Sequence, residues 1–315
     1  MNISDLDLET EIYPCPICGG SNFITLAKSD RHLLGIKTAG CKGCGLVQTN
    51  PRPSAYGLDN FYRNLYREFY QGVTTPSEDY VLSLNKDERL NYTAKRIIEK
   101  CKLSSDSIVL DYGCGEGSLF VALKNAGFIG IMFGVEPNKN FAKYASERSG
   151  AIVLDTLEKI DTKVSCIVVN HVLEHLHNPV EFLKKISLII EPGGLIYIDV
   201  PDVDLYTSVN DLHIAHLYHF NERTLRMASE KAGYIVLDCE KHSPLYHPKS
   251  ITAVLKKNLD KIYDVDLKGC ELSEESWRVV QKIQRGAWLF KLKNILRKIP
   301  LCIFVYRIFK KKHLI

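Results

Sequence analysis

Residues 109–119 read VLDYGCGEGSL, and this stretch decides the fold. Its apolar start predicts a buried strand. Gly113, Gly115 and Gly117 predict a tight turn whose backbone a ligand can approach closely, and a helix is expected to begin at Ser118. The stretch therefore predicts the strand–turn–helix unit that opens an α/β sheet.

The residues within this turn indicate the charge of its ligand. A dinucleotide-binding turn of the form GxGxxG would place its third glycine at position 118, where this chain has serine. Asp111 and Glu116 flank the glycines, and two carboxylates disfavour an anionic pyrophosphate but attract a cation. Cys114 is expected to pack beside the ligand as a small apolar residue. The turn therefore indicates a ligand with a positively charged portion.

Strand and helix patterns alternate downstream of the turn, which predicts a parallel sheet with helices on its faces. The predicted strands are 107–113, 131–137, 151–155, 164–170, 195–201, 234–240 and 251–257. The predicted helices are 118–127, 138–150 and 178–190, with a short helical turn at 157–160.

Further candidate ligand-binding residues stand where the next predicted strands end. Glu136 follows Gly117 by nineteen residues and is itself followed by Pro137. A carboxylate at such a strand end can accept hydrogen bonds from both hydroxyls of a ribose. The candidates that follow the later strands are Asp155, Thr156, Asn170 and His171.

Taken in order, these segments resemble the class I S-adenosylmethionine-dependent methyltransferases over residues 106–258. The resemblance implies a Rossmann-like core that binds S-adenosylmethionine over the Gly113–Gly117 turn. It also implies that Asp155 and Thr156 border the adenine.

Four cysteines form two CxxC pairs near the N-terminus. Cys15 and Cys18 belong to CPIC, and Cys41 and Cys44 belong to CKGC. Glycines and a proline beside the pairs predict turns that bring four thiolates to one metal ion, the ligand set of structural zinc. A site closed by four thiolates leaves no position for a substrate, so we interpret this zinc as structural. The intervening segment has almost no core of its own, so the metal is expected to supply much of its folding free energy.

Two groups of three histidines follow the predicted fourth and fifth strands, whose ends open onto one crevice in this class of fold. His171 and His175 lie four residues apart, but HVLEH does not match a zinc-binding HEXXH helix. His175 either orders its loop or acts on a substrate, and His219 either caps the next helix or acts on a substrate. The two groups are His171, His175 and His177, and His213, His216 and His219.

The cysteine pairs, the tyrosine-rich stretch FYRNLY, the core motifs and AHLYHF together resemble zinc-containing methyltransferases of nucleotide-sugar and surface-polysaccharide pathways. The resemblance covers about residues 13–258 and places His216 at the acceptor, as general base. Members that methylate a sugar carbon carry tyrosine where this chain has His213, and a large further C-terminal domain. These departures favour methylation of a sugar or glycan hydroxyl.

Charge is distributed unevenly along the chain. The net charge is +4, yet residues 277–315 carry eleven Lys and Arg and no Asp or Glu, so the first 276 residues carry −7. WLFKLKNILRKIPLCIFVYRIFKKKHLI, at 288–315, predicts a basic amphipathic helix broken near Pro300. This helix either lies on an anionic membrane surface or docks on the core.

The sequence thus predicts a zinc-binding module, a helical linker, a methyltransferase core and a basic helical tail. An acidic start without an apolar stretch predicts no signal peptide, and a cytoplasmic protein, peripheral at the inner membrane face if the tail binds lipid. The expected boundaries are 1–50, 51–105, 106–258 and 259–315.

The predicted reaction is methyl transfer from S-adenosylmethionine to a sugar or glycan acceptor. Alternative acceptors are a quinone, a lipid-linked molecule or RNA, although an acidic body and cysteine turns without interleaved basic and aromatic residues argue against nucleic acid. The non-enzyme alternative is a zinc-bearing scaffold on a degenerate methyltransferase fold.

Overall fold

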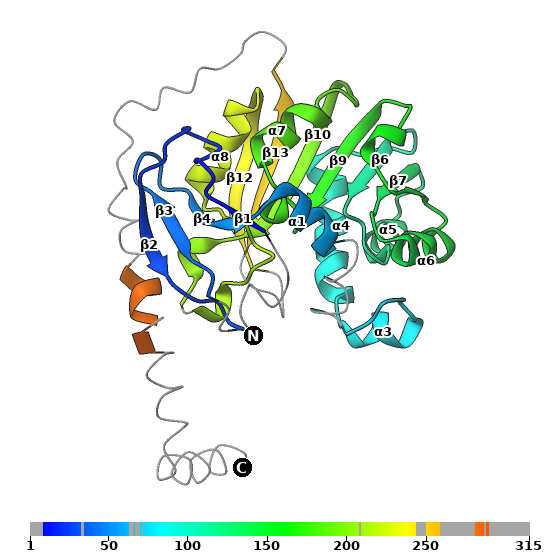
Figure 1. Cartoon of the computed structure of the whole chain (residues 1–315). Coiled ribbons are helices and arrows are strands. Elements are labelled where there is room, and N and C mark those ends of the chain that lie inside the picture. The colour runs from blue at the N-terminus through cyan, green and yellow to red at the C-terminus, as the bar shows by residue number, and fades with distance from the viewer. Residues whose placement is uncertain are drawn as a thin grey trace, which may run out of the picture.

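A seven-stranded sheet forms the centre of the computed structural model (Figure 1). The structure describes residues 9–32, 35–62, 66, 70, 72–207, 209–243, 250–258, 281–286 and 288–289. The strands, in their order across the sheet, are β12 (Tyr234–His242), β13 (Ser250–Lys257), β10 (Ile190–Pro201), β9 (Val164–Asn170), β6 (Ile108–Tyr112), β7 (Ile131–Val135) and β8 (Ile152–Leu154).

Each of the seven predicted strands is present, but the sheet is not wholly parallel. β13 runs antiparallel to both of its neighbours, β10 and β12. The reason is the short connection between β12 and β13, which spans only residues 243–249. A parallel neighbour needs a crossover of roughly a dozen residues or more.

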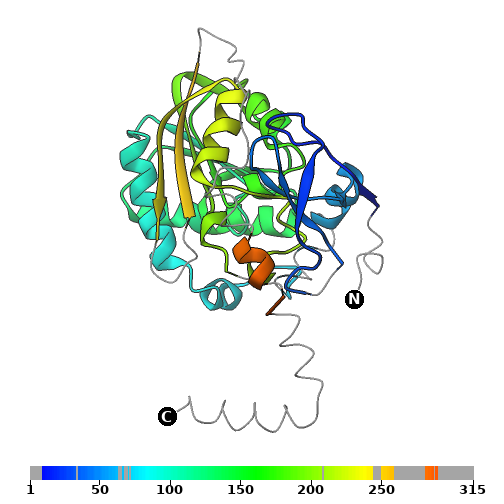
Figure 2. The ribbon, with the colours of Figure 1, turned by 90° about the vertical axis from the view of Figure 1, so that its left-hand side faces the viewer.

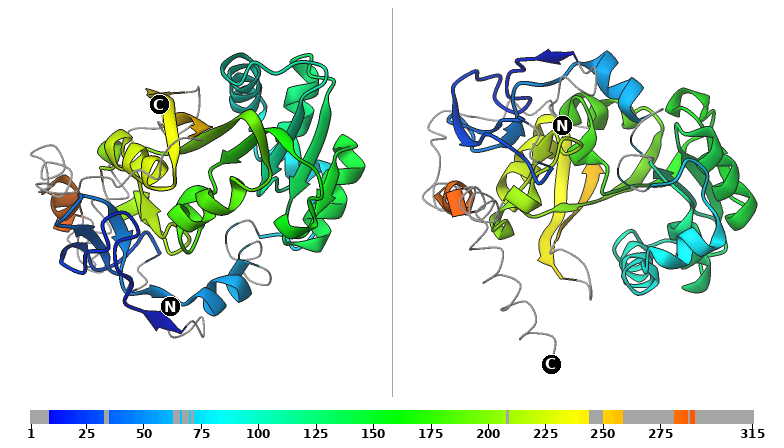
Figure 3. Two further views of the ribbon diagram at one scale, coloured as in Figure 1. Left: turned by 90° about the horizontal axis from the view of Figure 1, so that it is seen from above. Right: turned by 60° about the horizontal axis from the view of Figure 1, so that its bottom comes forward.

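Helices cover both faces of the sheet (Figures 1 and 3). Alternate strand residues supply the two faces: Val109 packs with one set of helices and Leu110 with the other. The first set is α4 (Asp87–Lys100), α5 (Ser118–Asn125) and α6 (Lys139–Ser149), and the second is α7 (Pro179–Ile186) and α8 (Glu222–Lys231).

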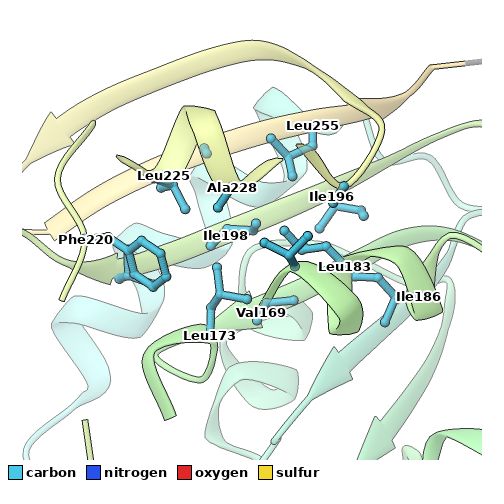
Figure 4. Packing of buried hydrophobic residues seen from close by; sticks show 14 of the residues in the cluster. Val169, Leu173, Leu183, Ile186, Ile196, Ile198, Phe220, Leu225, Ala228 and Leu255 are labelled. Carbon is cyan, nitrogen blue, oxygen red and sulfur yellow. The ribbon is translucent and has the colours of Figure 1, made fainter. Parts of the chain in front are cut away.

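Figure 4 shows the second of these packed layers. Leu183 and Ile186 of α7 and Leu225 and Ala228 of α8 contact the apolar side chains of the central strands. α7 ends at Ile186, because β10 already begins at Ile190, where it pairs with Val164. The predicted helix at 178–190 was therefore too long at its C-terminal end.

The N-terminal module is a small sheet completed by a strand from the core. Its order is β11 (Tyr218–His219), β4 (Val47–Thr49), β3 (Thr38–Cys41) and β2 (Phe23–Ala27). β1 (Thr10–Glu11) pairs separately with β5 (Arg52–Pro53). In Figure 1 these strands lie beside α8, at the opposite end of the molecule from α5 and α6.

Short helices lie between the module and the core, and further short helices lie in the loops of the core. Within the predicted helical linker at 51–105, residues 63–65, 67–69 and 71 lie outside the described residues. The predicted turn at 157–160 is confirmed as a 3-10 helix. These elements are α1 (Ala55–Asn60), α3 (Glu78–Ser83), η3 (Leu157–Lys159), η4 (Leu173–His175), η5 (Val203–Leu205) and η6 (Val209–Asp211).

The described part of the C-terminal tail packs against the N-terminal module. Residues 281–286 are helical and lie beside β2 (Figure 2). Ile283 is fully buried in a cluster with Leu26 and Val47, and Gln284 Nε2 donates to the carbonyl of Thr25 at 3.0 Å. The predicted basic helix at 288–315 lies outside the described residues, except for residues 288 and 289. Among the described helices, none is long and apolar enough to cross a membrane.

We predict that Ile283→Ala lowers the free energy of unfolding by about 2–4 kcal/mol, because it removes a buried side chain and leaves a cavity. Urea denaturation of the full chain measures this change. Trp288→Ala is the matched control, since Trp288 is 62% exposed and its loss should cost under about 0.5 kcal/mol. Equal stability of Ile283→Ala and wild type would show that the tail does not pack on the module.

Candidate active site

The glycine turn joins β6 to α5 with backbone angles that disfavour other residues. Gly113, Gly115 and Gly117 have φ values of +79°, +56° and +78°. A Cβ atom on Gly113 would lie 2.7 Å from Cγ2 of Val172, and one on Gly117 would lie 3.0 Å from Cα of Ala145. Gly113 therefore lets the turn close against the loop that follows β9, and Gly117 lets it close against α6.

Glu136, at the end of β7, ties this turn to the next loop. Its carboxylate accepts the backbone N–H of Gly115 at 3.1 Å and that of Asn138 at 3.0 Å, and the side chain is only 3% exposed. Two charge-assisted hydrogen bonds of this kind fix both backbone segments around one side chain.

Negative charge is concentrated around the turn. Burial, together with the neighbouring carboxylates of Glu116 and Glu136, raises the pKa of Asp111 to about 7. Glu116 accepts hydrogen bonds from Lys86 Nζ at 3.3 Å and from Ser118 Oγ at 3.0 Å. A cation bound beside Asp111 would favour its ionised form, so this end of the site suits a positively charged group.

One cleft of about 840 Å³ runs from the glycine turn to the histidines. Its volume is within the usual range for small-molecule sites, roughly 300–1,000 Å³. Gly117 does not line it, because this residue packs against α6. The predicted residues that line the cleft are Asp111, Gly113, Cys114, Gly115, Glu116, Glu136, Pro137, Asp155, Thr156, Asn170, His171, His175, His177, His213 and His216.

A buried carboxylate lies among the histidines at one end of the cleft. Glu174 is 1% exposed, and neither of its side-chain oxygens has a hydrogen-bond partner within the described ranges. Its Oε1 lies 3.4 Å from Nδ1 of His171, 3.9 Å from Nε2 of His175 and 3.8 Å from Nε2 of His216. An isolated buried carboxylate is costly, so a positive charge that develops on one of these rings is stabilised here.

His175 is held by hydrogen bonds to the segment before His216. Its Nδ1 lies 2.8 Å from the carbonyl oxygen of Ala215, which also accepts a bond from the Tyr62 hydroxyl at 2.9 Å. Because a carbonyl only accepts, Nδ1 of His175 carries a hydrogen. In the neutral ring Nε2 is then unprotonated and faces Glu174.

His213 and His216 pack ring against ring, with centroids 3.7 Å apart. Burial is the main cause that lowers the pKa of His216 well below its ordinary value, and the charges of His213 and His175 lower it further. Burial likewise lowers the pKa of His213. Both rings are therefore neutral near pH 7, and the same burial makes them weak bases unless a neighbouring negative charge stabilises the protonated ring.

His219 does not line the cleft, although the sequence placed it among the candidate catalytic residues. It belongs to β11, is 2% exposed, and its Nδ1 lies 3.3 Å from the hydroxyl of Tyr206. Pairing of His219 with Val47 of β4 turns the side chain into the interface with the module. Asn221 instead caps α8, so His219 is not the cap either.

The four N-terminal cysteines come together as the CxxC spacing predicts. Their sulfur atoms all lie within 4.8 Å of one another, with 3.3 Å between Cys15 and Cys44 and 3.4 Å between Cys18 and Cys41. A Cβ atom on Gly20 or Gly43 would lie 3.2 Å from the sulfur of Cys18, so small residues are needed beside the cluster.

Several cleft and loop residues were missed at the level of sequence. Arg89 lines the cleft without a hydrogen bond or ion pair to any described residue, and burial lowers its pKa. Arg89 belongs to helix α4, and nothing in the sequence of this helix predicts that its side chain reaches the cleft. Glu174 was visible only as part of HVLEH, and Tyr62 only as part of a tyrosine-rich stretch.

Comparison with known proteins places the core in a family. The family model described as a methyltransferase domain matches residues 87–258, and this chain belongs to that family. It is 26% identical over 151 residues to the "Putative methyltransferase 235L" of Invertebrate iridescent virus 6, a match that spans 46% of this chain and 57% of the viral protein.

A second relative matches over a longer stretch. The chain is 23% identical over 215 residues to the "Ubiquinone biosynthesis O-methyltransferase" of Rickettsia bellii, which spans 66% of this chain and 84% of that protein. Among solved structures, Burkholderia thailandensis 1,6-didemethyltoxoflavin-N1-methyltransferase superposes with a TM-score of 0.51 at 18% identity. That superposition covers 70% of this chain and 96% of the other, and it shows a shared fold.

We predict that Gly113→Ala destabilises the chain by about 1–3 kcal/mol, because the added methyl group overpacks Val172. Adding Val172→Ala should restore part of this loss, since it removes the atom that the new Cβ meets. Urea denaturation of the two single variants and the double variant measures the coupling. Strictly additive losses would show that the contact between the turn and the β9 loop is unimportant.

Proposed function

We propose that this protein transfers a methyl group from S-adenosylmethionine to a hydroxyl group of a small-molecule acceptor. The observation that carries the proposal is the single cleft that joins the acidic glycine turn to the neutral histidines. One end suits a cationic nucleoside ligand, and the other offers proton acceptors. The chain's membership of a family defined by a methyltransferase domain supports the same reaction.

The residues at the turn fit the parts of S-adenosylmethionine. The carboxylates of Asp111 and Glu116 suit its ammonium group, and the guanidinium of Arg89 suits its carboxylate. Glu136 would meet the ribose hydroxyls, and Asp155 and Thr156 would border the adenine. When bound, S-adenosylmethionine supplies a methyl group already activated by its positively charged sulfur, so the protein has mainly to align the two substrates.

His216 is the proposed general base for the acceptor hydroxyl. Its neutral ring can take the hydroxyl proton as the oxygen attacks the methyl carbon. Glu174, 3.8 Å away, stabilises the imidazolium that results. His175 is held by Ala215 and Tyr62 and keeps the loop in place beside it.

A sugar or glycan of nucleotide-sugar or surface-polysaccharide biosynthesis is the proposed acceptor. Three tyrosines, Tyr62, Tyr66 and Tyr70, line the cleft beside His175 and His213, and such aromatic walls suit the apolar faces of rings. The same walls suit a phenol, and the likeness to a ubiquinone biosynthesis O-methyltransferase favours a quinol as the second candidate.

The four-cysteine cluster is the proposed site of a structural zinc ion. Zinc–sulfur bonds of about 2.3 Å in a tetrahedron require sulfur atoms roughly 3.8 Å apart, which the observed spacing approaches. All four positions are then filled by protein, so this ion would hold the module together and take no part in methyl transfer.

We predict one zinc ion per chain in protein purified without chelators. Cys44→Ser should release it and unfold the module, because an ion bound by four thiolates supplies much of the folding free energy of so small a unit. Elemental analysis and near-ultraviolet circular dichroism measure the two effects, with Cys239→Ser as the control cysteine outside the cluster. Metal-free wild-type protein with an intact module would overturn the assignment.

We predict that His216→Asn lowers the single-turnover rate of methyl transfer by about 10²–10⁴-fold, the usual contribution of a general base. Affinity for S-adenosylmethionine, measured by calorimetry, should stay within a few-fold, because His216 serves the other substrate. The rate is measured with the acceptor selected from a panel of nucleotide sugars, glycans and catechols.

His219→Asn is the matched control, because this histidine does not line the cleft and its loss should lower the rate far less than His216→Asn does. A His216→Asn variant with wild-type turnover would remove His216 from the mechanism.

A further inference from the structure

Arg52, in β5, is a buried cation outside the cleft. Its side chain is 0% exposed, and its guanidinium stacks 3.4 Å from the ring centroid of Tyr13. The nearest carboxylate, that of Glu11, lies 3.4 Å from Nε and is 37% exposed. A buried guanidinium is expensive unless its donors are satisfied, so the groups it binds show what it holds together.

Arg52 bonds to both histidine-bearing loops. Nη1 donates to the backbone carbonyl of His177 at 2.6 Å and to the hydroxyl of Tyr218, and that hydroxyl itself donates to the same carbonyl at 2.9 Å. His177 lies two residues after His175, and Tyr218 lies two residues after His216. One guanidinium thus holds both loops, and in each loop it binds a residue two positions after the histidine that lines the cleft.

The N-terminal module reinforces this junction. Thr49 Oγ1 donates to the carbonyl of His216 at 3.0 Å, and the backbone N–H of Thr49 donates to the carbonyl of Leu217 at 2.9 Å. The N–H of Leu217 in turn donates to the carbonyl of Glu174 at 2.8 Å. The cysteine module and the two loops therefore share one hydrogen-bonded network.

We infer that Arg52 is a positioning residue, which sets the separation of His175, Glu174 and His216 and so makes methyl transfer depend on the N-terminal module. The inference rests on the proposed function. Arg52 does not line the cleft, so it acts through the two loops and not on a substrate. A lysine ammonium has a single nitrogen and no planar face, so it cannot bond to the carbonyl and to the ring of His177 from separate nitrogens while it stacks on Tyr13.

The test compares Arg52→Lys and Arg52→Gln with Arg223→Gln in the full chain. Arg223 also bridges module and core, since its Nη1 donates to the carbonyl of Cys44 at 3.0 Å, but among the described residues no hydrogen bond joins it to either histidine loop. Three quantities are measured: S-adenosylmethionine affinity, the single-turnover rate, and the ¹⁵N-histidine spectrum of the protein both without ligand and with S-adenosylhomocysteine added.

Both Arg52 variants should lose about 10- to 100-fold in the single-turnover rate, the effect of a small misplacement of a catalytic group. Their S-adenosylmethionine affinity should stay within about twofold, and the imidazole signals of His175 and His216 should shift. In Arg52→Gly, added guanidinium should restore part of the rate, which a general loss of stability would not allow.

Unshifted signals of His175 and His216 in a folded Arg52 variant would overturn the inference, as would an equal rate loss in Arg223→Gln. If both Arg52 variants fail to fold, Tyr218→Phe replaces them and should give a smaller loss and shift in the same signals. No affinity of wild-type protein for S-adenosylmethionine would contradict the proposed function alone, since the histidine spectra still test the positioning.

Discussion

Close contact between the glycine turn and the loop after β9 is the constraint on which the rest of the site depends. A Cβ atom on Gly113 would lie 2.7 Å from Val172, so only glycine lets the two segments meet. The turn carries the acidic end of the cleft, and the loop carries Glu174 and His175. Glu136 then fixes the turn from the other side through Gly115. The distance between the two ends of the cleft follows from this packing.

The second half of the site comes from the pairing of β11 with β4. This pairing makes two residues of the core, Tyr218 and His219, the edge of the module's sheet. It places His216 two residues before a strand that pairs with the module, with its ring next to that of His175. The cysteine cluster therefore lies within a unit whose outer strand, β11, directly follows the segment that carries His216 into the histidine end of the cleft. The module therefore helps to form the site, because its sheet holds the strand that follows His216.

The sequence predicted the sheet strands and the cysteine cluster, and most of the site residues it proposed line the cleft, because each follows from a local pattern. A continuous apolar run marks a buried strand, and CxxC spacing marks a metal site. β11 has two residues, too few for any periodicity, and its partner lies about 170 residues away. Arg52 stands between two prolines in what reads as a loop. The burial of His219 and the position of Arg89 in the cleft depend on such distant contacts, so no local sequence pattern predicts them.

Equilibrium binding tests the central claim, that the cleft of this chain is built for a cationic nucleoside. Calorimetry with S-adenosylmethionine, S-adenosylhomocysteine and NAD compares ligands that share an adenosine but differ in charge. We expect one S-adenosylmethionine or S-adenosylhomocysteine to bind per chain, each far more tightly than NAD, because Asp111 and Glu116 repel a pyrophosphate. Tighter binding of NAD, or no binding of either adenosyl ligand, would contradict the account.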